Sequence, residues 1–428
     1  MMRIMPLDGV KKEEILARST ALADVSGAVT AIIAEVRARG DAALFALTEK
    51  FDGVALASLE VTKEEIEAAV AAVEPGFLAI LKKAAANIRF YHEKQVRRGF
   101  TIEKMSGVVL GQKILPVDVA GIYVPGGTAA YPSTVLMDAI PAKIAGCPQV
   151  VMVTPPGKDG SVPPAILAAA AVAGVDRIFK IGGAQAVAAL AYGTETVPKA
   201  DKIVGPGNAY VAEAKKQVFG VVSIDMIAGP SEILIVADGK SDPAWVAADL
   251  LSQAEHDKNA SAVLVTDSAA LAKAVQAEVE KQLTDLPRAA IARASIENNG
   301  KIIVTPDIGT AVDVANELAP EHLELCVDDP FALLDRVRHA GSVFLGRACP
   351  EALGDYLAGP NHTLPTGGTA RFSSPLSVDD FIKKTQFIYY NAEALGDVAA
   401  DVARFAETEG LSGHARSARI RIKKEAKP

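Results

Sequence analysis

Chemically versatile side chains are scarce in this 428-residue chain, which has six histidines, three cysteines and one tryptophan. The cysteines, Cys147, Cys326 and Cys349, are odd in number and widely spaced, and no C-x-x-C occurs. Neither a disulfide framework nor a thiolate zinc site is therefore indicated. Cys147 and Cys326 stand beside apolar residues, where buried packing is the expected role of a free cysteine.

The chain also lacks a long apolar segment. Its most apolar run, residues 165–175, is rich in alanine and too short to span a bilayer, and the N-terminus shows no secretory signal. Acidic residues (52) outnumber Lys and Arg (44), and the formal net charge of −8 argues against a broad nucleic-acid-binding surface. These absences predict a cytoplasmic protein that binds neither nucleic acid nor membrane.

What the sequence does contain is an alternation of strand and helix patterns. Residues 26–95 place apolar side chains at helical spacing, and residues 100–125 change toward the two-residue period of strands. From Val150 onward, short apolar strands alternate with helical segments, and a second such series follows residue 237. Alternation of this kind predicts an α/β fold with parallel sheets covered by helices.

Three predicted strands end in glycine-rich segments, at residues 121–127, 181–186 and 205–208. The G-x-G-x-x-G fingerprint of dinucleotide-binding folds is absent. Glycines at the carboxyl ends of parallel strands nevertheless let backbone amides approach a phosphate, with a helix N-terminus adding a favourable dipole. The segments indicate either a nucleotide site or tight turns alone.

Two short motifs contain candidate catalytic or metal-binding histidines. Gln253 and His256 are three residues apart on one predicted helix and share a face, although a histidine there also suits the end of a helix electrostatically. Glu321 and His322 adjoin where a strand begins. An acid beside an imidazole can divide the work of proton transfer, and a plain surface turn is the alternative.

Further candidates lie in polar segments near the C-terminus. Asp355 and His362 belong to a stretch that combines polar residues with Gly and Pro, as functional loops do, and Glu409 precedes His414. His92 and His339 lie next to charges in helical patterns and are expected to be packed or solvated residues. A combined site would offer nitrogen and oxygen ligands suited to zinc, from Gln253, His256, Asp355 and His414.

Together these motifs resemble the histidinol dehydrogenase family. That family oxidises L-histidinol to L-histidine with NAD, in two successive hydride transfers through enzyme-bound L-histidinaldehyde, as the last steps of histidine biosynthesis. The resemblance covers about residues 25–420, in the family's order. Its segments are GIYVPGG at 121, KIGGAQA at 180, GPGN at 205, IAGPSE at 227, DLLSQAEHD at 249, APEHLEL at 319, GSVFLG at 341, GDYLAGPNHTLPT at 354 and EGLSGHARS at 409.

The resemblance implies a role for each candidate residue. Glu321 and His322 would be the catalytic acid–base pair, and NAD would contact Tyr123, Gln185 and Asn208. One zinc ion per subunit would be held by Gln253, His256, Asp355 and His414. The residues implied in binding L-histidinol are Ser231, Gln253, His256, His322, Asp355, His362, Glu409 and His414.

The resemblance also implies a homodimer with shared active sites, in which the C-terminal segment crosses to the partner subunit. We therefore expect two Rossmann-like domains, one inserted in the other, with a helical N-terminal segment and a C-terminal dimerisation arm. The expected parts are an N-terminal segment (1–25), a discontinuous domain with the metal and catalytic residues (26–124 and 237–376), an NAD-binding domain (125–236) and the arm (377–428).

Two other functions compete with histidinol oxidation. A paralogous dehydrogenase with the same fold, zinc and NAD would oxidise another polar alcohol, such as a sulfonated propanediol. Glu409 and Ser231 favour histidinol, because a carboxylate suits its amine whereas a sulfonate would prefer arginine. A non-catalytic metal- or nucleotide-binding protein would leave the Glu321–His322 pair without a role.

Overall fold

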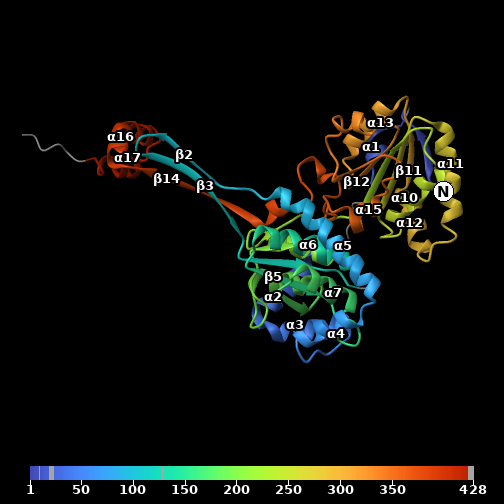
Figure 1. The fold of residues 1–428 in the computed structure, drawn as a ribbon, viewed down its shortest axis with the longest axis horizontal. Helices are drawn as coiled ribbons and strands as arrows, with labels where there is room; N and C mark the ends of the chain where they lie inside the picture. The colour runs from blue at the N-terminus through green and yellow to red at the C-terminus, as the bar shows by residue number, and fades with distance from the viewer. Residues whose placement is uncertain (9, 19–23, 127–129, 423–428) are drawn as a thin grey trace, which may run out of the picture. The chain divides into compact units, whose positions relative to one another are not determined.

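The structure is a computed structural model that describes residues 1–8, 10–18, 24–126 and 130–422. The chain divides into two compact units, which are described separately. The first unit comprises residues 1–95 and 117–381, and the second comprises residues 96–116 and 382–428. Figure 1 shows the ribbon of both units and labels many of their helices and strands.

A six-stranded parallel sheet occupies one part of the first unit, with the strand order β1-β11-β10-β9-β12-β13. Its central strands are continuous apolar runs, as expected where helices cover both faces. The strands are β1 (Arg3–Pro6), β9 (Glu232–Ala237), β10 (Ser261–Thr266), β11 (Lys301–Val304), β12 (His322–Cys326) and β13 (Ser342–Leu345).

Helices cover the two faces of this sheet with separate apolar clusters. One face packs against α10 (Pro243–Ala254), α11 (Ala269–Gln282) and α12 (Ala289–Asn299). The other face packs against α1 (Lys12–Leu16), α13 (Ile308–Leu318) and α14 (Phe331–Leu334). Asp242 starts α10 by accepting the Ala244 amide at 2.8 Å, with Pro243 in the first turn, as its sequence predicts.

A five-stranded parallel sheet forms the other core of the first unit, with the order β6-β5-β4-β7-β8. Its strands are β4 (Val119–Tyr123), β5 (Gln149–Thr154), β6 (Arg177–Lys180), β7 (Lys202–Val204) and β8 (Ser223–Ile224). Helices α6 (Pro132–Ala145) and α7 (Pro164–Ala173) cover one face, and α8 (Gly183–Tyr192) and α9 (Ala209–Val218) cover the other. The predicted α/β class with parallel-sheet domains is confirmed.

The N-terminal helices pack on the five-stranded sheet. Helices α4 (Lys63–Ala72) and α5 (Pro75–His92) join the apolar cluster of α6 and α7, and α2 (Ser26–Arg39) and α3 (Asp41–Asp52) join that of α8. This packing differs from the predicted grouping of residues 26–124 with residues 237–376. An apolar helix face shows that the helix is covered, but not by which sheet.

The second unit contains an antiparallel three-stranded sheet, with the order β14-β3-β2. Strands β2 (Phe100–Met105) and β3 (Val108–Pro116) come from the predicted strand meander, and β14 (Ile382–Tyr390) pairs along the whole of β3. Helices α16 (Ala392–Thr408) and α17 (Ser412–Arg419) follow and contact each other. The predicted C-terminal arm thus shares its unit with a hairpin from residues 100–116.

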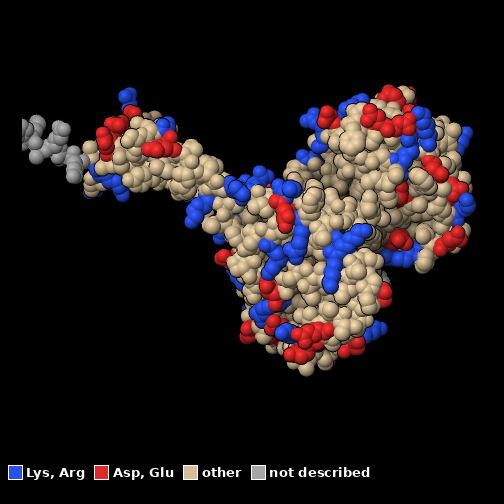
Figure 2. Space-filling view, in the orientation of Figure 1, with Lys and Arg blue, Asp and Glu red and all other residues tan. Residues whose placement is uncertain are grey.

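The remaining elements are short: α15 (Glu351–Leu353), the π-helical turn η2 (Gly354–Ala358), and the 3₁₀ turns η1 (Glu93–Gln95), η3 (Thr369–Arg371) and η4 (Val378–Phe381). Among the described residues, no helix is long and apolar enough to cross a membrane. Both signs of charge occur on each unit on the face drawn in Figure 2.

Candidate active site

The Glu321–His322 pair follows a sharp turn at the end of α13. Ala319 has a φ of 47° and is the one described residue other than glycine in the left-handed region. A residue in this conformation ends a helix, and Pro320 prevents its continuation. The chain therefore enters β12 directly after Glu321, and both Glu321 and His322 are buried.

The main chain of Glu232 contacts both members of this pair. Its amide donates to Glu321 Oε2 at 2.8 Å, and its carbonyl oxygen lies 3.0 Å from Nδ1 of His322. A carbonyl can only accept, so Nδ1 carries a hydrogen and Nε2 of the neutral ring is the free acceptor. Nε2 has no hydrogen-bond partner among the described residues.

Two further carboxylates face His322 Nε2. Glu351 Oε1 and Asp355 Oδ1 each lie 3.8 Å from it, and the same Asp355 oxygen lies 3.8 Å from Nδ1 of His362. One ligand atom from each of His322, Glu351 and Asp355 lies within 4.8 Å of the other two. Asp355 belongs to the π-helical turn η2, a conformation frequent at functional sites.

This cluster suits a divalent cation. Both polar atoms of the buried Gln253 amide and Oε1 of Glu351 lack hydrogen-bond partners in the part of the chain that the structure describes. Buried polar atoms are normally satisfied, so their pairing with an ion is a physical explanation. Nitrogen and carboxylate or amide oxygen donors fit zinc and similar ions. Glu351 is not among the ligands predicted from sequence, since no motif distinguishes it.

The pKa values of Glu321 and His322 both lie far above their usual ranges. Burial raises the pKa of Glu321 to about 8, against the opposing effect of His322. Burial disfavours the charged form of His322, but the neighbouring Glu321 and Asp355 carboxylates outweigh it and raise its pKa to about 10. Both groups therefore hold exchangeable protons at neutral pH in the metal-free protein. A divalent cation bound to Asp355 would offset the carboxylate charge that raises the pKa of His322, and so would free Nε2 to accept a proton.

The other predicted substrate and metal residues divide between the two units. Ser231 directly precedes β9, and its carbonyl accepts the Ser261 amide at 2.9 Å. His256 follows α10 and is exposed, yet the surrounding protein lowers its pKa by desolvation while Asp355 opposes this. Glu409 and His414 are exposed residues of the second unit, at the end of α16 and in α17. The four-ligand zinc set therefore stays a prediction.

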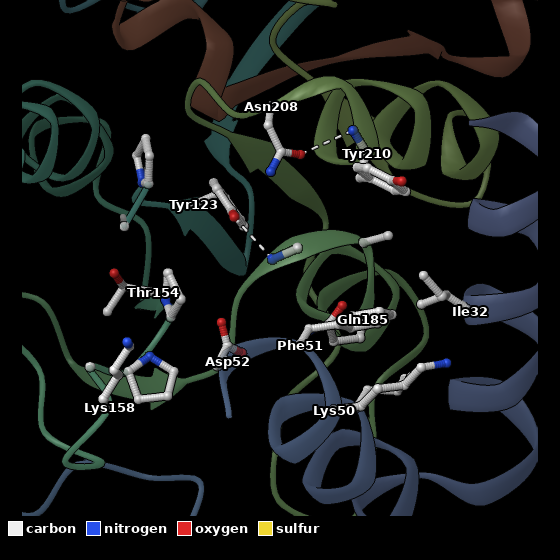
Figure 3. A pocket seen from close by; sticks show the side chains of 18 of the residues that line it. Ile32, Lys50, Phe51, Asp52, Tyr123, Thr154, Lys158, Gln185, Asn208 and Tyr210 are labelled. Carbon is white, nitrogen blue, oxygen red and sulfur yellow. Dashed lines mark hydrogen bonds between the residues drawn. The ribbon is translucent and has the colours of Figure 1, made fainter. Parts of the chain in front are cut away.

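A cavity of about 1100 Å³ lies at the carboxyl ends of β4 and β5. All three glycine-rich segments contribute to its lining, as do the predicted NAD residues Tyr123, Gln185 and Asn208. In Figure 3 the Tyr123 hydroxyl points to the amide of Gly183 at the start of α8, which donates to it at 3.0 Å. Asn208 caps α9 by accepting the amides of Tyr210 and Val211.

Other residues of this cavity were not expected from the sequence. They come from α2, from the end of α3, and from the end of β5 and the segment after it, and Figure 3 shows them around the same space. They include Ile32, Lys50, Phe51, Asp52, Thr154 and Lys158. Helices α2 and α3 reach the cavity by packing on the sheet and are far from the glycine motifs in sequence. The spacing of those motifs therefore could not identify the residues that the helices contribute.

A buried polar network supports the GPGN segment next to this cavity. Gly205 has a φ of 111°, and a Cβ there would lie 2.2 Å from the Tyr123 carbonyl oxygen, so only glycine fits. Its amide donates to Asp225 at 2.8 Å, and its carbonyl accepts from Lys215 at 3.0 Å. Lys215 and Asp225 also form a buried ion pair.

The same region is bonded to the loop that carries His362. Asp138 on α6 accepts from the Thr363 hydroxyl at 2.8 Å, and Asn361 donates to the Met137 carbonyl at 2.7 Å. Asn361 also lies 3.4 Å from Nε2 of His92, which is fully buried. His92 is thus a packed residue, as expected, and the loop beside the candidate catalytic cluster is fixed to α6.

Asp138→Asn is expected to remove a pH-dependent loss of stability. Burial raises the pKa of the folded-state Asp138 carboxyl to about 8, whereas its unfolded value is about 4. Below about pH 4 the carboxyl is protonated in both states and does not reduce stability. As the pH rises toward 8 the carboxyl ionises only in the unfolded state, so the folded protein loses stability over that range. Relative to wild type, the melting temperature of the variant should rise by about 2–4 °C between pH 5 and pH 8. The exposed Asp267→Asn serves as control, and parallel curves for all three proteins would contradict this.

Comparison with known proteins identifies relatives of this chain. A sequence model described as histidinol dehydrogenase matches residues 16–422. The chain is 58% identical over 397 residues to a histidinol dehydrogenase of Geobacillus kaustophilus (strain HTA426), covering 93% of this chain and 94% of that protein. It is 56% identical over 430 residues to one of Syntrophotalea carbinolica, covering 99% and 100%.

A solved structure is similar over nearly the whole chain. It is the crystal structure of a histidinol dehydrogenase from Elizabethkingia anophelis, with a TM-score of 0.92 and 39% sequence identity. The similarity covers 98% of this chain and 97% of that chain. The fold of this chain therefore agrees with that of a histidinol dehydrogenase over almost its whole length.

Proposed function

The chain belongs to the histidinol dehydrogenase family, and on that premise we propose that it oxidises L-histidinol to L-histidine with NAD. The oxidation proceeds in two successive hydride transfers through an enzyme-bound aldehyde, as the last steps of histidine biosynthesis. The observation that carries the proposal is the buried Glu321–His322 pair, with His322 Nε2 unpaired beside Asp355 and Glu351.

His322 is the base of the first step. Its Nδ1–H is fixed on the Glu232 carbonyl, so Nε2 is left to accept the hydroxyl proton of the substrate. The ring is buried and packs 6.0 Å from the Phe344 ring, centroid to centroid, which restricts its rotation. His322 accepts a proton again when the hydrated aldehyde is oxidised.

Glu321 serves the second step. The aldehyde must gain water before it can lose a second hydride, and Glu321 takes the proton of that water. Only Oε2 of its carboxyl group is engaged by the Glu232 amide, which leaves Oε1 for the water. Burial keeps the proton affinity of this carboxyl high, as a group that alternately accepts and donates a proton needs.

Side chains of this chain suit both cofactors of the proposed reaction. Gln253, His256 and Asp355 would hold zinc, together with His414 of a second subunit. Zinc when bound would fix the imidazole and amine of histidinol and so orient the carbinol carbon. Tyr123, Gln185 and Asn208 would hold NAD in the 1100 Å³ cavity, and NAD when bound supplies the hydride acceptor.

The substrate is held from several segments in this proposal. Ser231 and His362 contact it from the first unit, and Glu409 pairs with its amine from the arm of a partner subunit in a homodimer. Exposed apolar side chains on the second unit support such a partner, among them Ile388 (73% exposed) and Phe405 (69% exposed). Large exposed apolar residues of this kind are typical of protein interfaces.

Formation of NADH from L-histidinol tests the proposal. Two NADH per histidinol are expected, with loss of activity after treatment with a chelator and recovery on addition of zinc. A sulfonated propanediol serves as the comparison substrate, because a paralogous dehydrogenase would prefer it. Faster turnover of that alcohol, or one NADH per histidinol, would contradict the proposed substrate or the two-step reaction.

Glu321→Gln is expected to separate the two half-reactions. The amide cannot take a proton from water, so oxidation of the aldehyde should fall by about 100-fold or more, whereas oxidation of the alcohol is affected less. Single-turnover measurements started from histidinol and from histidinaldehyde would compare the two rates. Wild-type rates in both half-reactions would remove Glu321 from the mechanism.

A further inference from the structure

Glu232, the first residue of β9, connects a distant side chain to the catalytic pair. Its amide holds Glu321 and its carbonyl holds His322, at the 2.8 and 3.0 Å distances given above. Its own carboxylate accepts two hydrogen bonds from Nη1 of Arg18, at 2.7 Å to Oε1 and 2.8 Å to Oε2. One residue thus contacts both catalytic side chains through its main chain and Arg18 through its side chain.

Arg18 also contacts the segment that precedes the pair in sequence. Its Nη2 donates to the carbonyl of Leu318, the last residue of α13. Leu318 lies three residues before Glu321, at the turn that directs the chain into β12. The guanidinium therefore joins the two segments whose relative position sets the Glu321 and His322 side chains.

The electrostatics make this contact difficult to replace. The Arg18 and Glu232 side chains are only 15% and 8% exposed, and burial raises the pKa of Glu232 while Arg18 opposes this. Without Arg18, the carboxylate would be a buried unpaired charge that must take up a proton or turn away. Either change would disturb the peptide on which the pair is held.

The residues that precede Arg18 are held against the six-stranded sheet. Nζ of Lys301, on β11, donates to the carbonyls of Ile15 at 3.0 Å, Glu14 at 3.3 Å and Ala17. Ile15 is buried in the apolar cluster on the α13 face of the sheet. The end of α1 is therefore fixed to the sheet one residue before Arg18.

We propose that Arg18 is a positioning residue for histidinol oxidation, which sets the geometry of the Glu321–His322 pair through Glu232 and Leu318. The inference rests on the proposed function. Arg18 contacts neither member of the pair directly, so its effect passes through the main chain of the two segments.

Arg18→Gln in the full-length enzyme is the first test, with Arg18→Lys beside it. A displaced pair should lower kcat about 10- to 100-fold and leave KM for histidinol within about twofold. Lysine keeps the charge without the forked contact, so an intermediate kcat is expected. Arg347→Gln is the matched control, because Arg347 makes a similar bidentate contact with Asp238 at the opposite end of β9. Its kcat should stay near wild type.

A double-mutant cycle with Glu321→Gln separates positioning from general stability. In the Glu321→Gln background, Arg18→Gln should cost much less than in wild type, because the side chain that it positions is already impaired. Equal losses in both backgrounds, or a wild-type kcat for Arg18→Gln, would overturn the inference alone. A wild-type enzyme that does not oxidise histidinol would overturn the proposed function and this inference together.

Discussion

His322→Asn is expected to lower kcat for histidinol by about 10³-fold, within the range by which a positioned acid–base group accelerates a reaction. Asparagine keeps polarity near the Glu232 carbonyl but offers no basic nitrogen at the position of Nε2. Nε2 lies 3.8 Å from both Asp355 and Glu351 and has no hydrogen-bond partner among the described residues, so the variant removes the free basic atom of the catalytic pair. Steady-state NADH formation measures the loss.

The control for this variant is His339→Asn, since His339 lies outside the cluster and should tolerate the change with little loss of kcat. A His322→Asn enzyme within tenfold of wild type would contradict its role as the base. Mixing inactive His322→Asn and His414→Asn subunits adds a test of the shared site. Hybrid dimers should regain activity, and none under conditions of proven subunit exchange would place the site within one chain.

His256→Asn is expected to weaken zinc binding by well over about 100-fold, since even residues that only support metal ligands are worth about 10- to 100-fold in affinity. The loss of one nitrogen donor leaves Gln253 and Asp355 from this unit. Metal content per subunit after dialysis against a chelator measures the effect, with the His339→Asn protein treated in parallel. A full equivalent of zinc in His256→Asn would show that His256 is not a ligand.

The repeating strand and helix patterns were enough to predict the fold class. In the five-stranded sheet, the glycine-rich strand ends also identified three of the segments that line the 1100 Å³ cavity. The sequence could not show that α2 to α5 cover that sheet, because the partner of an apolar helix face is chosen by tertiary packing.

The candidate catalytic cluster was predictable only in part. Glu321 and His322 stood out because an acid beside a histidine is chemically conspicuous. The main chain of Glu232 contacts both of them, and the Glu232 side chain is paired with Arg18, 214 residues away in sequence. Backbone groups leave no trace in a sequence, and an arginine 300 residues from the turn at Leu318 has no local pattern to distinguish it.

The pairing of β1 with β11 has a consequence for the order of synthesis. Strand β1 (Arg3–Pro6) is translated before the other strands of its sheet, yet its only neighbour among the described strands ends at Val304. At about 5–20 residues per second, roughly 15–60 seconds separate the emergence of the two. The five-stranded sheet has been translated completely by then. The N-terminal segment, including Arg18, therefore stays without its native partners until those have been translated. During this time it is available to chaperones and to non-native contacts.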